Sequence, residues 1–224
     1  MRKESIHRGA NRILALMAIC LLLYGCAQPF RITDFGGGIF IRDREEKLPL
    51  KAGLFLIGKT RDYAVYGRYG ATKILMGKAL ETVAVESLGK VFQGVSLFHK
   101  EDTAPQDIES IITIEFGPET KSEMVLADPD KRNDEVTSVV ELLYIVYDKK
   151  WTLLWEGKSV GHNTQQFAKY KPIFGLGGGA GGARAGMHSI PEWIQTARDS
   201  LRLALEQMND QILISGKDNI LKGK

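Results

Sequence analysis

The sequence predicts an α+β two-layer sandwich, in which two helices cover one face of a largely antiparallel sheet. Two segments carry apolar residues at spacings of three and four, as amphipathic helices do, and short apolar runs typical of strands lie between them. The chain has 224 residues, of which 44% are hydrophobic and 25% charged, and it holds two cysteines. This composition is that of a globular protein and excludes a small disulfide-rich scaffold.

Residues 1–25 predict an export signal. A basic stretch up to Arg12 precedes an apolar run over residues 13–25, which is too short to span a bilayer comfortably. Four basic residues and one acidic residue in this segment account for the net charge of +3, and the rest of the chain holds 26 basic and 26 acidic residues. Because nucleic-acid binders usually show a basic excess, we expect no nucleic-acid partner.

The signal ends in Leu23-Tyr24-Gly25-Cys26, which resembles the lipobox of bacterial lipoproteins. The resemblance implies that the Cys26 sulfur receives a diacylglyceryl group, that the chain is cleaved before Cys26, and that the new amino group is acylated. Several acyl chains together anchor a protein firmly in a membrane. Ala27 stands where inner-membrane lipoproteins typically carry Asp, which implies an outer-membrane lipoprotein facing the periplasm. A plain signal anchor with an incidental cysteine is the alternative.

The mature chain is expected to have three parts. Residues 26–50 are a lipidated tether, because a run of three glycines and the charged run 42–47 favour a flexible, solvated segment. Residues 51–216 form a single periplasmic domain, and residues 217–224 form a polar tail. Cys20 lies within the signal and leaves with it. Cys26 is therefore expected to be the one cysteine of the mature chain, and its sulfur is already lipidated.

The domain opens with a strand and a helix. Residues 52–58 form an almost continuous apolar run bounded by glycine, which predicts a buried strand. Tyr63, Tyr66 and Tyr69 follow in a loop-like stretch and are expected to seal the edge of the core. An amphipathic helix is expected over residues 72–94. Its apolar face consists of Ile74, Leu75, Ala79, Leu80, Val83, Ala84, Leu88, Val91 and Phe92.

The middle of the chain predicts strands. Short apolar runs favour strands over residues 94–98 and 111–116. The strongest signal covers residues 136–147, and a polar turn separates it from a second run over residues 151–160, which together predict a hairpin. The strand over 136–147 is apolar on both faces, so we expect it at the centre of the sheet.

A glycine-rich segment and a second helix end the domain. We expect residues 174–186 to be a mobile loop at a membrane-distal or partner-facing edge, although an anion at the following helix N-terminus is physically possible. Ser189 and Glu192 match the N-cap and N3 positions of a capping box, and Gly216 offers a C-cap. The apolar face consists of Trp193, Ala197, Leu201, Ala204, Leu205, Met208 and Ile212.

One motif resembles a catalytic signature. Residues 157–161 match G-x-S-x-G, the nucleophile elbow of α/β hydrolases, which lies between a strand and a helix and precedes an acid and then a histidine. No helical pattern follows here, and no acid lies between Ser159 and either His162 or His188. We therefore interpret Ser159 as a structural serine in an edge strand and expect no catalytic residue.

Other candidate sites lack the required spacing. The sequence Gly157-Lys158-Ser159 ends like a P-loop, but Thr152 stands where that motif needs glycine. Three widely separated histidines remain in the mature chain: His99, His162 and His188. A loosely alternating acidic turn, without the glycine and glutamate of a calcium loop, contains Asp128, Asp130 and Asp134. We expect neither a metal site nor a cofactor.

The order of elements behind the lipobox resembles that of small periplasm-facing accessory lipoproteins, such as those of lipopolysaccharide assembly and of envelope transport or secretion systems. The resemblance implies a non-enzymatic accessory subunit that binds an envelope complex through an apolar patch or an unpaired strand edge, which suits the doubly apolar strand 136–147. A carrier of a lipid or other apolar ligand, with a cavity between helices and sheet, is the alternative. An envelope hydrolase with a cleft at Ser159 or His162 is a third hypothesis.

Overall fold

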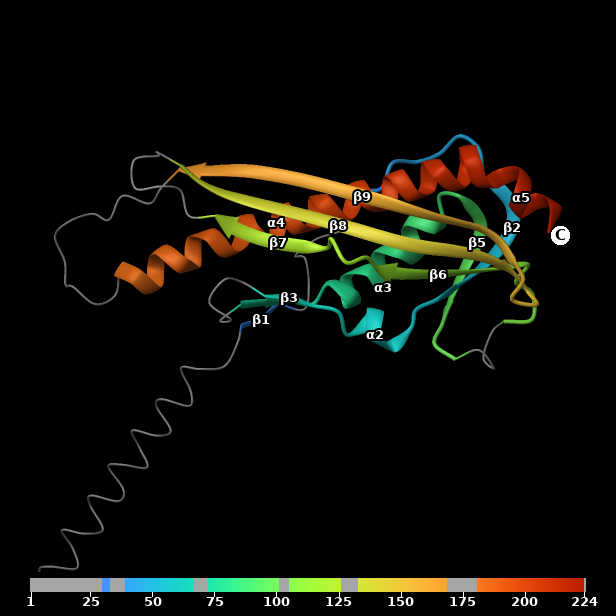
Figure 1. Ribbon diagram of the computed structural model, residues 1–224, viewed down its shortest axis with the longest axis horizontal. Coiled ribbons are helices and arrows are strands. Elements are labelled where there is room, and N and C mark those ends of the chain that lie inside the picture. The colour runs from blue at the N-terminus through green and yellow to red at the C-terminus, as the bar shows by residue number, and fades with distance from the viewer. Residues whose placement is uncertain are drawn as a thin grey trace, which may run out of the picture.

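The computed structural model describes residues 30–32, 39–66, 72–100, 105–125, 133–168 and 181–223. Within these residues the chain forms a six-stranded sheet with a helical layer packed on one face, and a separate three-stranded sheet (Figure 1). The predicted α+β sandwich is confirmed.

The main sheet is mixed. Its strands follow the order β5 (Phe92–Phe98), β2 (Leu48–Phe55), β6 (Ser110–Phe116) and β8 (Asn133–Asp148), and β8 also pairs with β7 (Lys121–Val125) and β9 (Leu153–Ala168). β5, β2 and β6 run parallel, whereas β6, β7 and β9 all pair antiparallel with β8. The parallel part arises because the chain crosses from β2 to β5 through helix α3 (Met76–Leu88).

β8 and β9 form the predicted hairpin, and each is 16 residues long. β8 is central, as expected, because β9 pairs along one edge while β6 and β7 share the other. In the turn, the Asp148 carboxylate accepts hydrogen bonds from the backbone N–H groups of Lys150 and Thr152, each at 2.8 Å. Trp151 completes the turn with a φ of 64°, a left-handed conformation that bulky residues rarely adopt.

Four short strands were not predicted, and none of them has a long apolar run. β7 has the sequence Lys-Ser-Glu-Met-Val and is formed by its pairing with β8. β4 (Thr72–Ile74) lies where the first helix was expected to begin, and it pairs with β1 (Phe30–Ile32) and with β3 (Val65–Tyr66) in the small sheet. Helix α3 therefore begins at Met76 and not at residue 72. A short helix, α2 (Gly58–Arg61), and the strands β3 and β4 precede it.

The last helix is longer than predicted at both ends. α4 (Gly181–Gln211) begins eight residues before Ser189, so the predicted cap at Ser189 and Glu192 is wrong. At the other end, a π-helical segment (Ile212–Gly216) leads into α5 (Lys217–Lys222), so Gly216 does not end the helix. The expected polar tail is thus helical, and its Ile220 is 1% exposed. No helix in the described ranges has the length and apolar character needed to cross a membrane.

The two predicted apolar helix faces pack in one core on the same face of the sheet. Seven of their residues are each at most 7% exposed: Leu80, Val83 and Leu88 of α3, and Trp193, Leu201, Leu205 and Met208 of α4. The same core contains inward side chains of the strands: Leu50, Leu54, Ile112, Ile114, Val140, Leu142 and Tyr144. The packing of both helices on the sheet is confirmed, but Ile74, Val91 and Phe92 of the expected first face lie outside α3, in β4, a turn and β5.

The structure differs from the expected tether over residues 26–50. Ile39 and Ile41 are 4% and 1% exposed and belong to the core, and β2 begins at Leu48. The sequence suggested a solvated segment because its charged run looks hydrophilic, yet apolar residues on either side of the run bury themselves against the domain. Residues 39–50 are therefore part of the folded domain.

Candidate functional site

Residues 43–47, which we call the clamp, attach the N-terminal segment to the helical layer. Four of the five side chains contact α4, α5 or the end of α3. The partners are Lys90 for Asp43 at 2.7 Å, Asp210 for Arg44 at 2.8 Å, Lys217 for Glu46, and the Gly89 carbonyl for Lys47 at 2.6 Å. A hydrogen bond from the Lys90 ammonium, together with its charge, lowers the pKa of the Asp43 carboxyl. The charged run thus forms specific contacts with the domain.

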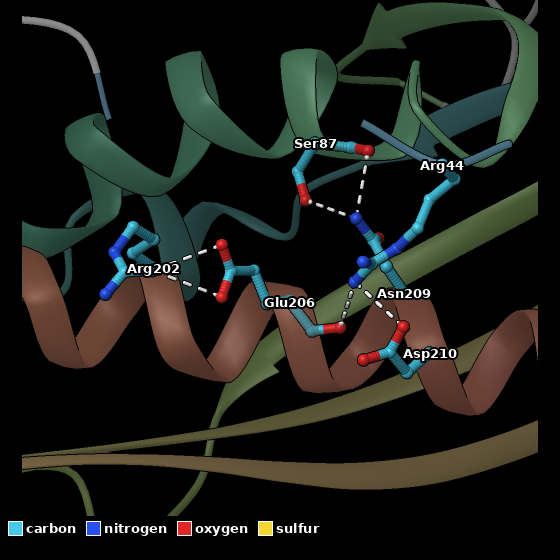
Figure 2. Close-up of polar contacts among 6 residues, drawn as sticks. All are labelled: Arg44, Ser87, Arg202, Glu206, Asn209 and Asp210. Carbon is cyan, nitrogen blue, oxygen red and sulfur yellow. Dashed lines mark hydrogen bonds and ion pairs between the residues drawn. The ribbon is translucent and has the colours of Figure 1, made fainter. Parts of the chain in front are cut away.

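Arg44 is the most deeply placed residue of the clamp. Its side chain is 11% exposed, and its Nη2 atom donates a hydrogen bond to the Glu206 backbone carbonyl at 3.2 Å as well as pairing with Asp210 (Figure 2). One turn earlier on α4, Arg202 forms two hydrogen bonds of 3.1 Å with the Glu206 carboxylate. The N-terminal segment therefore contacts the polar side of α4 at Glu206 and Asp210.

A buried amide joins the two long helices beside Arg44. The Asn209 Nδ2 atom on α4 donates hydrogen bonds to the Ser87 carbonyl at 3.1 Å and to the Ser87 hydroxyl at 3.0 Å (Figure 2). Both residues are fully buried. These two hydrogen bonds satisfy the buried amide nitrogen of Asn209 and connect α4 to the end of α3 at this point.

The G-x-S-x-G residues form a stripe of small side chains beneath α4. In a strand, alternate residues share a face, so Gly157, Ser159 and Gly161 all point toward the helices. A Cβ atom on Gly161 would lie 1.8 Å from the Ser200 backbone oxygen, and one on Gly157 would lie 2.4 Å from the Tyr144 hydroxyl. The stripe allows α4 to rest directly on β9 and leaves no room for an acyl chain between them at Gly161.

Ser159 lies in the middle of this stripe and not at an elbow. It is fully buried, it pairs with Leu142 in an uninterrupted ladder, and its hydroxyl has no hydrogen-bond partner among the described residues. A nucleophile elbow needs a sharp turn from strand to helix with an exposed hydroxyl. β9 continues as a strand for nine more residues, so this geometry is excluded.

The face of the main sheet turned away from the helices, which we call the open face, carries an apolar strip on β8 and β9. Leu143 and Val160 are 38% and 36% exposed, and Val139 and Ile145 beside them are half-buried. The register places Glu141 opposite Val160 and Leu143 opposite Lys158, so these residues are neighbours on one surface. A strip of this kind suits contact with a protein partner.

An ion pair lies within the strip. The Glu141 carboxylate is 2% exposed, pairs with the Lys158 ammonium at 2.6 Å and accepts a hydrogen bond from the Glu119 backbone N–H at 3.1 Å. A Cβ on Gly117 would lie 2.1 Å from this carboxylate, so the chain after β6 closes over it only with glycine there. The hydrogen bond from Lys158 is the largest effect and lowers the pKa of Glu141, although burial opposes it.

We expect Glu141→Gln to lower the free energy of unfolding at pH 7 by about 1 kcal/mol, because Lys158 is half-exposed and solvent screens the lost charge. The folded pKa of Glu141 is below its ordinary value of 4.5, so the carboxylate stabilises the fold above that pH and the stabilisation is lost as the pH falls through the folded pKa. Urea unfolding should therefore separate the variant from wild type at pH 7 and bring them together in acid. Glu156→Gln, at an exposed position of β9, is the control and should match wild type at both pH values.

The remaining predicted residues are dispersed or lie outside the described part of the chain. Cys26, Tyr69, Asp128 and Asp130 lie outside it, as does most of the expected loop 174–186, and the side chains of Asp134 and His188 are not among those described.

His99 lies 3.2 Å from Glu81 beyond β5, while His162 is exposed on the open face, so they do not form one site. Tyr63 does close the core edge, stacked on Phe116 at 4.4 Å, whereas Tyr66 is 59% exposed.

No protein-family model matches the chain, and no curated protein matches its sequence. Among solved structures, a neuraminyllactose-binding hemagglutinin homolog from Helicobacter pylori aligns with a TM-score of 0.48 and 11% identity, over 84% of this chain and 96% of the other. Uncharacterized lipoprotein B from Nitrosomonas europaea aligns with a TM-score of 0.41 and 14% identity, over 81% and 95% of the two chains. A minor lipoprotein from Acinetobacter baumannii aligns with a TM-score of 0.35 and 15% identity, over 78% and 95%. With every TM-score below 0.5, these likenesses assign no function to this chain.

Proposed function

We propose that this protein is a non-enzymatic lipoprotein of the bacterial envelope, anchored in the outer membrane through acylated Cys26 and facing the periplasm. There it serves as an accessory subunit of an assembly, transport or secretion complex. The anchoring rests on the complete signal that ends in Leu23-Tyr24-Gly25-Cys26. The accessory role rests on one structural observation, the apolar strip of the open face.

The strip supports a protein partner because the helices cover only the other face of the sheet. Leu143 and Val160 expose apolar surface at its centre, and the Glu141–Lys158 pair adds a polar group that a partner can recognise. Interfaces combine an apolar centre with a small number of oriented polar groups in this way. The strip also agrees with the expectation that a doubly apolar strand would leave one face for a partner.

The two competing hypotheses have less support. A serine hydrolase would need Ser159 at an exposed turn, but the residue is buried in a continuous strand. A carrier of an apolar ligand would need space between the helices and the sheet, and at Gly161 the backbone of α4 is in direct contact with β9. The accessory role is therefore the function that the geometry favours.

The anchoring is tested by Cys26→Ser in cells that receive a radiolabelled fatty acid. Wild type should incorporate the label and sediment with outer membranes. The variant should lose the label entirely and collect as a precursor with its signal attached, because cleavage requires the modified cysteine. A variant that still matures and sediments like wild type would contradict the lipoprotein assignment.

The accessory role is tested by placing a photoreactive residue at Leu143 of the acylated protein in living cells. We expect a discrete cross-linked product of one mass from Leu143, because the strip is in contact with one partner. Lys78, an exposed residue of α3 in the helical layer, is the matched control and should give none. Equal yields from both positions, or none from Leu143, would overturn the accessory role even where acylation is intact.

A further inference from the structure

The small sheet holds the N-terminal end of the described chain at one side of the domain. β1 pairs in parallel with β4, from Phe30 opposite Thr72 to Ile32 opposite Ile74, and β4 pairs with β3. Cys26 precedes Phe30 by four residues, which span at most about 14 Å when fully extended. Acyl chains on Cys26 therefore enter a membrane close to β1, because only a short linker joins the domain to its anchor.

Helix α2 packs against the start of α3, and β3 and β4 of the small sheet lie between the two helices in the chain. α2 abuts the start of α3, where a Cβ on Gly77 would lie 2.2 Å from the Thr60 carbonyl oxygen, and the Gly77 N–H donates a hydrogen bond to the Tyr63 carbonyl at 3.0 Å. α3 itself begins just after β4. Figure 1 shows β1, β3 and α2 together on the side of the molecule opposite β9. This side is therefore the one nearest the anchor.

Four side chains on this side make up what we call the basal surface: Ile57, Lys59, Tyr66 and Lys73. Tyr66 and Ile57 are 59% and 39% exposed, which is high for large apolar residues. Lys59 is also exposed, and the Lys73 ammonium lies 5.4 Å from the centre of the Tyr66 ring. Tyr66 and Lys73 are cross-strand neighbours on β3 and β4, and Ile57 and Lys59 lie at the start of α2.

The basal surface carries the positive charges of Lys59 and Lys73. Nearby, Arg61 pairs with Glu81 at 3.7 Å, so these two charges offset each other. Asp62, which follows Arg61 in the chain, is acidic and exposed. Tyrosine with lysine is the combination found where proteins meet lipid headgroups, since the ring enters the interface and the ammonium binds phosphate. Such a contact adds a second membrane signal to an acyl anchor.

We propose that the basal surface lies on the anionic phospholipid headgroups of the membrane that holds the acyl chains of Cys26. The proposal rests on the proposed function, because it needs the anchor. Its occupant follows from the short linker of three residues between Cys26 and β1 and from the charge of Lys59 and Lys73. The domain then stands in one orientation, with the basal surface on the bilayer and β9 directed into the periplasm.

The orientation is tested with the acylated mature protein in vesicles of phosphatidylethanolamine and phosphatidylglycerol. Because the Cys26 sulfur is acylated, Tyr66→Cys and His162→Cys each supply a single free thiol for an environment-sensitive dye. We expect the dye at residue 66 to emit at shorter wavelength and to be quenched by brominated lipids, and the dye at residue 162 on β9 to behave as in water. Protein that fails to enter the vesicles contradicts the anchor itself. Protein that enters them with identical dye signals at both positions overturns the orientation alone.

The charge contribution is tested in the same vesicles with Lys59→Gln and Lys73→Gln combined. Each lysine near an anionic surface shifts the equilibrium between bound and released orientations about fivefold, so the dye signal at residue 66 should fall markedly. Lys149→Gln with Lys150→Gln, two exposed lysines of the hairpin turn, is the matched control and should leave the signal unchanged. An effect of the control pair and none of the basal pair would overturn the proposal, as would a signal at residue 66 that is equally strong in vesicles of phosphatidylcholine alone.

Discussion

Gly161→Val should destabilise the protein by about 3 kcal/mol or more, because the added side chain meets backbone and not a flexible side chain. A Cβ at this position would lie 1.8 Å from the Ser200 oxygen and 2.6 Å from the Ala204 nitrogen, both on α4. No rotamer change relieves these contacts, so the helix must move off β9 and give up part of its packing. Urea unfolding followed by far-ultraviolet circular dichroism measures the loss.

Gly58→Ala is the control for this substitution, since nothing lies within 4 Å of the Cβ that it adds. It should leave the free energy of unfolding within about 0.5 kcal/mol of wild type. If Gly161→Val proves as stable as Gly58→Ala, then α4 does not rest on β9 as described, and a space between helix and sheet reopens the carrier hypothesis.

Leu201→Ala should lower the free energy of unfolding by about 2–5 kcal/mol, the usual effect of truncating a fully buried leucine in a packed site. Natural domains have only about 5–15 kcal/mol of stability in total. In a domain of this size, the thermal midpoint should fall by about 5–15 °C. Differential scanning calorimetry of the purified protein is the measurement.

Arg202→Ala tests the polar side of the same helix turn. Its pair with Glu206 is a half-exposed contact between residues four apart, so the change should cost only about 0.5 kcal/mol. Suppose that Leu201→Ala leaves stability intact but abolishes cross-linking to a partner. The apolar face of α4 would then be the binding surface and not core, against its burial in the structure.

Features that depend on local periodicity could be predicted from the sequence. The alternation of Leu142 and Tyr144 with less buried neighbours, and the helical spacing of Leu201, Leu205 and Met208, reflect burial directly. The hairpin and the apolar face of α4 therefore lie where the pattern predicts them, whereas the first helix is shorter than its pattern. The apolar character of strand 136–147 on both faces also anticipated the strip on the open face.

Features that depend on distant partners could not be predicted. The clamp looked like a solvated tether because Arg44 meets Asp210, a residue 166 positions away along the chain, and no local pattern encodes that pairing. Gly216 looked like a cap, yet it lies beneath Trp155, where a Cβ would come within 3.0 Å of the indole. β7 and β4 exist because a neighbouring strand pairs with them, which propensity alone does not reveal.

The stripe on β9 has a consequence for how short catalytic patterns arise by chance. Where a helix backbone touches a strand, every second strand residue must be small, which favours glycine, alanine or serine, while the residues between them face the other side of the sheet. A strand under that constraint carries Gly-x-Ser-x-Gly for reasons of packing alone. A substitution at Val160 should therefore cost less folding stability than one at Gly157 or Gly161, a pattern set by the contact with α4 and not by any reactivity of Ser159.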